Sequence, residues 1–163
     1  MTDIIVADAS PIIIATHTNL LLHLQSIVGR VIIPPKVAEE CLKPLKNDSM
    51  AIKEAIEQNI LTVSAKVEHD FLSRIPYGID AGEAEAIALA LSLNARLLID
   101  DRKGRKIAKH EGLHILGFGA ILVKVKKAGI IPTVLPIIQH MHAMHYHISD
   151  RVVEEILMLC GEC

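Results

Sequence analysis

Five acidic residues have types and positions that could do chemistry together: Asp8, Glu40, Glu83, Asp100 and Asp101. Asp8 and the Asp100–Asp101 pair each come directly after a short apolar run that is typical of a buried strand. We expect Glu40 and Glu83 in the first turns of helices that begin near the same edge. In open α/β sheets, the loops that leave the carboxyl ends of the strands form the functional crevice. The acids are therefore expected to converge on one crevice.

Carboxylates that share a crevice repel one another, and without a counter-charge some of them would take up protons. A divalent cation removes that repulsion, and carboxylate oxygens with water are the ligands that Mg²⁺ or Mn²⁺ prefers. Such an ion lowers the pKa of a bound water and can hold a phosphate for in-line attack. The acids therefore predict a metal-dependent hydrolase that acts on phosphodiester bonds.

Each acid also has an ordinary structural role open to it. Asp80 and Glu83 have the spacing of a capping box, in which each side chain bonds a backbone N–H of the other residue. Asp100 or Asp101 could cap the helix that follows the pair, and Asp8 could be a turn residue or an Asx cap before Pro11. Glu40 could be a solvated acid that interacts with its helix dipole. The joint occurrence favours a site, because capping alone does not require acids at all these positions.

Apolar runs alternate with helical patterns over the first 118 residues. We expect strands at 4–7, 31–33, 60–64, 97–99 and 114–116. Because these runs are apolar on both faces, they predict a parallel sheet that is covered by helices on both sides. Expected core helices include one capped by Asn19 that runs to Ser26, and others at 50–58, 83–91 and 103–109.

From residue 119 onward the pattern is helical only, with helices expected at 121–128, 133–143 and 149–159. We expect one domain over 1–163, with an α/β core at 1–118 and a helical extension at 119–163.

Composition limits how this chain could contact nucleic acid. Its 163 residues include two Phe, two Tyr and no Trp, so base stacking on an aromatic platform is not expected. The formal net charge of -2 excludes a polycation held on nucleic acid by charge alone. A local cluster follows Asp101 and comprises Arg102, Lys103, Arg105, Lys106 and Lys109. This cluster could contact the phosphates of single-stranded RNA, or it could be a solvated helix face.

Three cysteines, an odd number without the spacing of a disulfide framework, suggest a reducing cytosol. No run approaches the roughly 18 apolar residues of a membrane span. Asp3 stands where a signal peptide would have Lys or Arg. We therefore expect a soluble cytoplasmic protein that does not contact a membrane.

The last part of the chain is rich in residue types that bind zinc, namely His140, His142, His145, His147, Cys160 and Cys163. The chain has no second CxxC pair, and the histidine spacing matches no standard zinc finger. This favours surface histidines and a reduced thiol pair over a structural zinc site.

The order of four segments resembles the PIN-domain family, in particular the VapC-like ribonuclease toxins and an uncharacterised prokaryotic PIN-like branch. The segments are Val6–Pro11, Ile33–Glu40, Gly82–Ala90 and Leu98–Arg102. No single segment is specific, and the resemblance depends on all four in this order. Residues 148–150 with the amphipathic helix after them are similar to the end of that branch.

This resemblance implies a three-layer α/β/α fold and an Mg²⁺- or Mn²⁺-dependent endoribonuclease that cleaves single-stranded RNA. Matched by position, its metal-binding acids are Asp8, Glu40, Glu83 and Asp101, and Asp100 could substitute for Asp101. Ser10 would hold water or phosphate near the metal. Many relatives have Asp where this chain has Glu83. The resemblance also suggests the toxin of a toxin–antitoxin pair, with an antitoxin protein as partner.

A second hypothesis keeps the fold without catalysis. Val153, Ile156 and Leu157 form an apolar face on the last expected helix, which could dock a partner or a second copy of the chain. We accordingly expect a homodimer. A phosphorylation-dependent receiver fits less well, because its acidic pair follows the first strand, whereas here the pair follows a late one.

Overall fold

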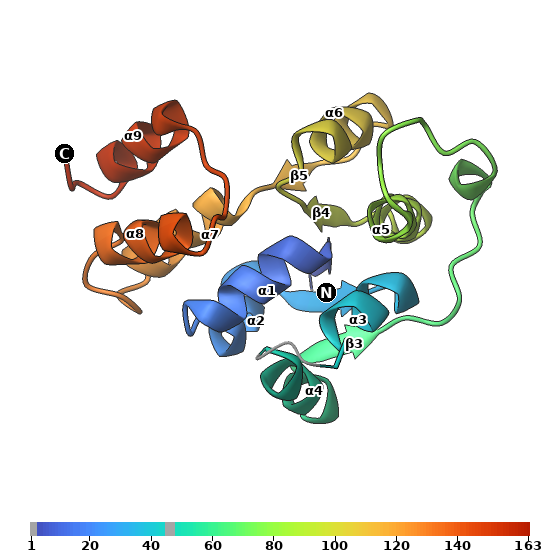
Figure 1. The fold of residues 1–163 in the computed structure, drawn as a ribbon, viewed down its shortest axis with the longest axis horizontal. Coiled ribbons are helices and arrows are strands. Elements are labelled where there is room, and N and C mark those ends of the chain that lie inside the picture. The colour runs from blue at the N-terminus through green and yellow to red at the C-terminus, as the bar shows by residue number, and fades with distance from the viewer. Residues whose placement is uncertain (1–2, 45–47) are drawn as a thin grey trace.

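The computed structural model describes residues 3–44 and 48–163, which contain a parallel sheet of five strands (Figure 1). The strands are β1 (Ile4–Ala7), β2 (Arg30–Ile33), β3 (Leu61–Val63), β4 (Arg96–Leu98) and β5 (Ile115–Leu116). Their order is β3-β2-β1-β4-β5, so the chain builds the sheet to one side of β1 and then crosses to the other side. The strand order therefore reverses between β1 and β4, where open α/β sheets form their crevices.

Helices connect the strands and make up the C-terminal part of the chain (Figure 1). They are α1 (Ala9–His17), α2 (Leu24–Val28), α3 (Pro35–Cys41), α4 (Ser49–Glu57), α5 (Ala81–Leu93), α6 (Arg102–His110), α7 (Phe118–Lys127), α8 (Leu135–Ala143) and α9 (Asp150–Leu159). Two short 3₁₀ turns are η1 (Leu21–His23) and η2 (Asp70–Ser73). Within the described ranges no single helix is long and apolar enough to span a membrane, and only the sharply bent pair Ala9–His17 and Leu21–Val28 passes that test together, by length and composition alone.

The expected α/β class with a central parallel sheet is confirmed, and each expected strand is present within one residue at either end. Burial explains why the apolar runs predicted the strands correctly. Ile5, Val6 and Ala7 have no exposed surface, so both faces of the central strand are covered. Helix α5 contacts both β1 and β4, and its residues 86–90 are all buried. That packing fixes the start of α5 beside the edge where β1 and β4 end.

Two local expectations were wrong. Asn19 does not cap a helix, because it adopts a left-handed conformation (φ 60°) in the turn that follows α1, while the next helical residues form η1 and α2. Glu40 does not lie in a first helical turn. Helix α3 begins at Pro35, directly after Pro34, and ends at Cys41, so Glu40 falls in its last turn.

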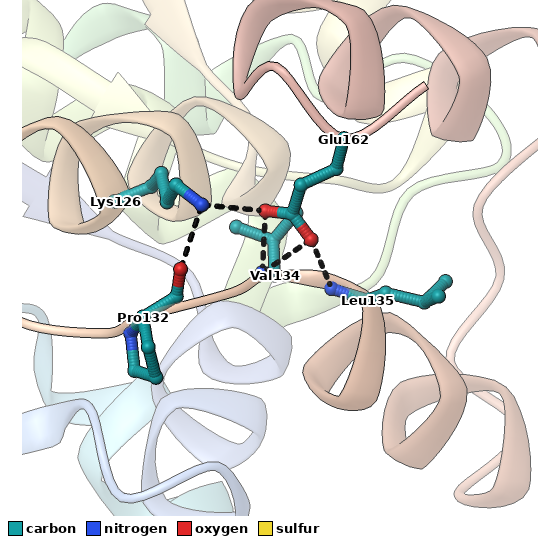
Figure 2. Close-up of polar contacts among 5 residues, drawn as sticks. All are labelled: Lys126, Pro132, Val134, Leu135 and Glu162. Atoms are coloured by element: carbon teal, nitrogen blue, oxygen red, sulfur yellow. Dashed lines mark hydrogen bonds and ion pairs between the residues drawn. The ribbon is translucent and has the colours of Figure 1, made fainter.

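Near the end of the chain, Glu162 contacts Lys126 of α7 and the residues at the start of α8 (Figure 2). The Glu162 carboxylate accepts hydrogen bonds from the N–H groups of Val134 (2.8 Å) and Leu135 (3.3 Å) at the start of α8. It also pairs with Lys126 Nζ of α7 at 3.1 Å, and that ammonium donates to the Pro132 carbonyl at 2.7 Å. One carboxylate thus joins the end of the chain to two helices, and it satisfies backbone donors that α8 leaves open.

We expect Glu162→Gln to lower the melting temperature at pH 7, because the amide loses the charge that Lys126 and the helix start both favour. These partners lower the pKa of Glu162, the backbone N–H of Val134 first and then Lys126. The carboxylate therefore contributes stability above its unfolded pKa and loses it as the pH falls through the folded pKa. The difference between wild type and variant should shrink in acid. Glu154→Gln, an exposed position of α9, is the matched control, and an equal effect of both substitutions would contradict the assignment.

Candidate active site

Asp8 is the most deeply placed acid of the predicted site. It follows β1 directly, the residue is 5% exposed, and its backbone N–H donates to the Leu98 carbonyl of β4 at 2.9 Å. It occupies the N-cap position of α1, yet its side chain makes no capping bond there. The turn or cap that the sequence leaves open for Asp8 is therefore not what fixes its carboxylate.

The pKa of Asp8 is raised from 3.8 to about 7, first by burial and then by the charges of Asp80, Glu40 and Asp101, while the Ala9 amide opposes the shift. Only acids close enough to interact through a poorly solvated region can do this. The structure thus brings the end of β1, the start of α5, the last turn of α3 and the start of α6 into electrostatic contact.

Glu83 lies at the start of α5 and is half-buried. Its pKa is raised from 4.5 to about 8, first by burial and then by the charges of Asp80, Asp101 and Asp8. Asp80 caps the helix, since its Oδ1 accepts from the Glu83 N–H at 2.7 Å. From the sequence Asp80 has only this capping role, yet its charge acts on both Asp8 and Glu83. Because Asp80 lies three residues before Glu83, its position in the sequence could have identified it as a member of the acidic site.

Glu40 reaches the site from the last turn of α3, which packs against α5. Its Oε2 lies 3.5 Å from the point that a Cβ on Gly82 would occupy. Glu85 of α5 accepts from the Lys36 N–H at 3.0 Å and so ties the start of α3 to α5. This contact fixes the two helices relative to each other, and the position of Glu40 relative to Glu83 with them.

The adjacent acids Asp100 and Asp101 have different partners. Asp101 caps α6, because its Oδ2 accepts from the Gly104 N–H at 2.7 Å. Asp100 accepts from the Phe118 N–H at 3.0 Å and from the Tyr146 hydroxyl. Burial raises the pKa of Asp100, and the bonds from Tyr146 and Phe118 oppose that effect. Both acids stay candidate ligands, and the partners of Asp100 favour Asp101 for that role.

The carboxylates approach one another without surrounding a common point. Within residues 3–44 and 48–163, no group of three or more His, Cys, Asp or Glu side chains is arranged to hold a metal ion. The donor chemistry nevertheless fits Mg²⁺ or Mn²⁺, because the site supplies carboxylate oxygens whose charges destabilise one another. The ligand set Asp8, Glu40, Glu83 and Asp101 stays a prediction, as does the role of Ser10, which is exposed on the first turn of α1.

The predicted RNA-binding residues divide into two kinds. Arg102, Lys103 and Lys106 are exposed on α6. Lys103 Nζ lies 5.1 Å from the centre of the Tyr77 ring, which is itself 93% exposed. Arg105 is half-buried and donates from Nη1 to the Ile99 carbonyl at 2.8 Å, so it stabilises the exit from β4. The first three are exposed where a phosphate could reach them, although Lys103 also lies over the Tyr77 ring, whereas Arg105 is held by a backbone carbonyl.

A family model described as a PIN domain (DUF3368) matches residues 4–162. The chain belongs to the PIN-domain family. PIN domains are generally nucleases, and they generally use divalent metal ions. A solved structure, a PilT N-terminus domain protein from the hyperthermophilic archaeon Sulfolobus solfataricus P2, is similar at 18% identity and a TM-score of 0.45, over 71% of this chain and 87% of that one. No curated protein matches.

We expect Asp8→Asn to stabilise the metal-free PIN domain at pH 8. Below about pH 4 the carboxyl is protonated in both states, and between there and about pH 7 only the unfolded chain loses its proton. Stability therefore falls as the pH rises through this window, and the amide removes that loss. The gain in the free energy of unfolding should be about 2–4 kcal/mol at pH 8 and near zero at pH 4, at about 1.4 kcal/mol per pKa unit. Denaturant unfolding in EDTA measures both, with exposed Asp70→Asn as control.

A second prediction concerns Gly117, next to the Asp100 contacts of the PIN domain. A Cβ at this position would lie 2.7 Å from Asp100 Oδ1 and 2.9 Å from Arg105 Nη1. We expect Gly117→Ala to lower the free energy of unfolding by about 1–3 kcal/mol, because both charged groups must shift. Gly82→Ala is the matched control, since its Cβ would meet neighbours at the ordinary separations of 3.4 and 3.5 Å. Equal effects of the two alanines would show that the crowding is harmless.

Proposed function

We propose that this PIN domain is an Mg²⁺- or Mn²⁺-dependent endoribonuclease that hydrolyses phosphodiester bonds of single-stranded RNA. The observation that carries the proposal is the burial of the Asp8 carboxyl together with its raised pKa. Its carboxyl lies at the strand-order reversal, and burial first and then the charges of Asp80, Glu40 and Asp101 raise its pKa to about 7. A cluster of acids that destabilise one another at neutral pH is costly to a fold unless a cation uses it.

Asp8, Glu40, Glu83 and Asp101 would hold the ion, which when bound supplies an activated water and neutralises charge on the phosphate. The chain prepares this site in two ways. Caps by Asp80 and Asp101 hold the starts of α5 and α6 in place, so the acids keep their positions. Glu83 and Asp8, with pKa values of about 8 and 7, carry protons near neutral pH that a cation would displace.

The RNA backbone would lie along the exposed cations of α6. Arg102 directly follows Asp101, and Lys103 and Lys106 are exposed on the same helix. Such contacts are to phosphates, so they position a strand without reading its sequence. Because the chain has only two Phe and two Tyr, we propose weak sequence discrimination at this surface.

Three finer parts of the proposal concern the setting of the protein in the cell. We propose a cytoplasmic toxin of a toxin–antitoxin pair, which acts as a homodimer and is inhibited by an antitoxin protein. A gene for a small DNA-binding protein directly beside this one would support the toxin role.

The decisive experiment is cleavage of a mixed pool of single-stranded RNA by purified protein with Mn²⁺. Wild type should cleave, and EDTA should abolish cleavage. Asp8→Asn should lower the rate about 100-fold or more, since loss of a ligand costs at least as much as loss of an outer-shell partner. Asp70→Asn should retain the wild-type rate. Retained cleavage by folded Asp8→Asn would rule out the assigned site.

A second candidate function is a PIN-fold interaction module without catalysis. It is favoured by the finding that, over the part of the chain that the structure describes, no three candidate ligands are arranged to hold an ion. Isothermal titration calorimetry with MnCl₂ separates the two functions. Uptake of Mn²⁺ that Asp8→Asn abolishes supports the nuclease, and absence of uptake supports the module.

A further inference from the structure

A groove runs beside the acidic site, between α6 and the C-terminal helices. Its volume is about 910 Å³, and we call it the α6–α9 groove. The residues that matter for its chemistry are Arg102, Lys106, Lys109, Val123, Val152 and Leu159. The proposed nuclease chemistry does not use most of this surface, so its character needs a separate explanation.

One wall of the α6–α9 groove is basic. Arg102, Lys106 and Lys109 are exposed, and their spacing of four and three residues places them along one face of α6. His147 also lines the groove, from the segment before α9. The positive charges therefore form a row along the groove rather than a single point.

The floor and the opposite wall are aliphatic. Val152, Ile156 and Leu159 follow one another at helical spacing on α9. Ile156 is buried, and its Cδ1 lies 2.8 Å from the point that a Cβ on Gly119 of α7 would occupy, so the two helices are in close contact there. Val152 is 40% exposed and Leu159 54% exposed. An apolar seam thus begins at the buried Ile156 and continues to the partly exposed side chains of Val152 and Leu159.

We propose that the α6–α9 groove binds an amphipathic helix of a partner protein, with an aliphatic face and an acidic flank. The aliphatic face would cover Val152 and Leu159, and the acidic flank would pair with the row of cations on α6. Such a helix would complement the basic wall of the groove in charge and the aliphatic wall in polarity.

RNA fits this groove less well. Among the residues that line it in the described part of the chain there is no Phe, Tyr or Trp on which a base could stack, and the ring that does line it is the small His147 imidazole. An aliphatic seam beside cations therefore favours a peptide.

A helix in the groove would cover Arg102 and Lys106. This consequence rests on the proposed function, in which the same two residues contact RNA. Binding of the partner and binding of RNA would then compete.

The test is fluorescence anisotropy with synthetic peptides of about 16 residues, long enough to form a helix. A panel carries Leu at i, i+3, i+4 and i+7 with Glu on the flank, and a matched panel carries Lys in place of Glu. The Glu panel should bind the full-length protein with an affinity that falls as salt is added, and the Lys panel should not bind. Failure of every Glu peptide to bind would overturn the proposal.

Variants locate the binding. Lys106→Glu and Leu159→Asp should each weaken binding of the Glu peptides about tenfold. The matched controls, which should not change binding, are Lys53→Glu on α4 and Met158→Asp, which is 71% exposed on α9 but does not line the groove. Equal effects of Leu159→Asp and Met158→Asp would overturn the proposal.

A labelled single-stranded RNA provides the competing outcome. If RNA binds wild type and both Lys106→Glu and Leu159→Asp weaken it while no Glu peptide binds, the groove is an RNA path. Absence of Mn²⁺-dependent cleavage by wild type would contradict the proposed nuclease function and leave the peptide measurement unaffected. The two failures are therefore distinguishable.

Discussion

The parallel pairing of β1 with β4 is the constraint on which the site depends. Through it the Asp8 N–H donates to the Leu98 carbonyl, and Ala7 lies in register with Leu98. The acids after both strands are thereby brought to one edge of the sheet. Strands β2 and β3 extend the sheet away from this seam, and β5 extends it on the other side. The site thus follows from strand order, because adjacent parallel strands end at the same edge.

Burial gives this arrangement its electrostatic character. A solvated cluster of acids would repel weakly, because water screens their charges. Asp8 is nearly inaccessible, and its carboxyl therefore senses charges on three neighbouring elements. The family membership and this crowding agree, since PIN domains are generally nucleases that use divalent ions. The fold thus contains a buried carboxylate that destabilises it, at a position where a bound cation would stabilise that charge.

Structural and chemical roles coincide in the same acids. Asp80 and Asp101 each cap a helix, and each also raises the pKa of Glu83. A cap orients its side chain by one hydrogen bond, while the charge of the carboxylate still acts on its neighbours. The segment between α8 and α9 adds a further support, because its Tyr146 hydroxyl bonds Asp100 directly beside Asp101.

The sequence determined the α/β class, the positions of the strands and which acids follow them, because burial on both faces leaves continuous apolar runs that can be read locally. It also indicated a capping role for Asp80 and for one of Asp100 and Asp101, and the structure shows that Asp80 and Asp101 are the caps. Tertiary structure alone decided the rest. The distinction between Asp100 and Asp101 depends on Phe118 and Tyr146, which lie 18 and 46 residues away in the chain. The placement of Glu40 depends on how α3 packs against α5. The α6–α9 groove depends on how the last helix packs against α7, so that its residues and those of α6 line one groove. Such contacts join residues far apart in sequence, so no local pattern carries them.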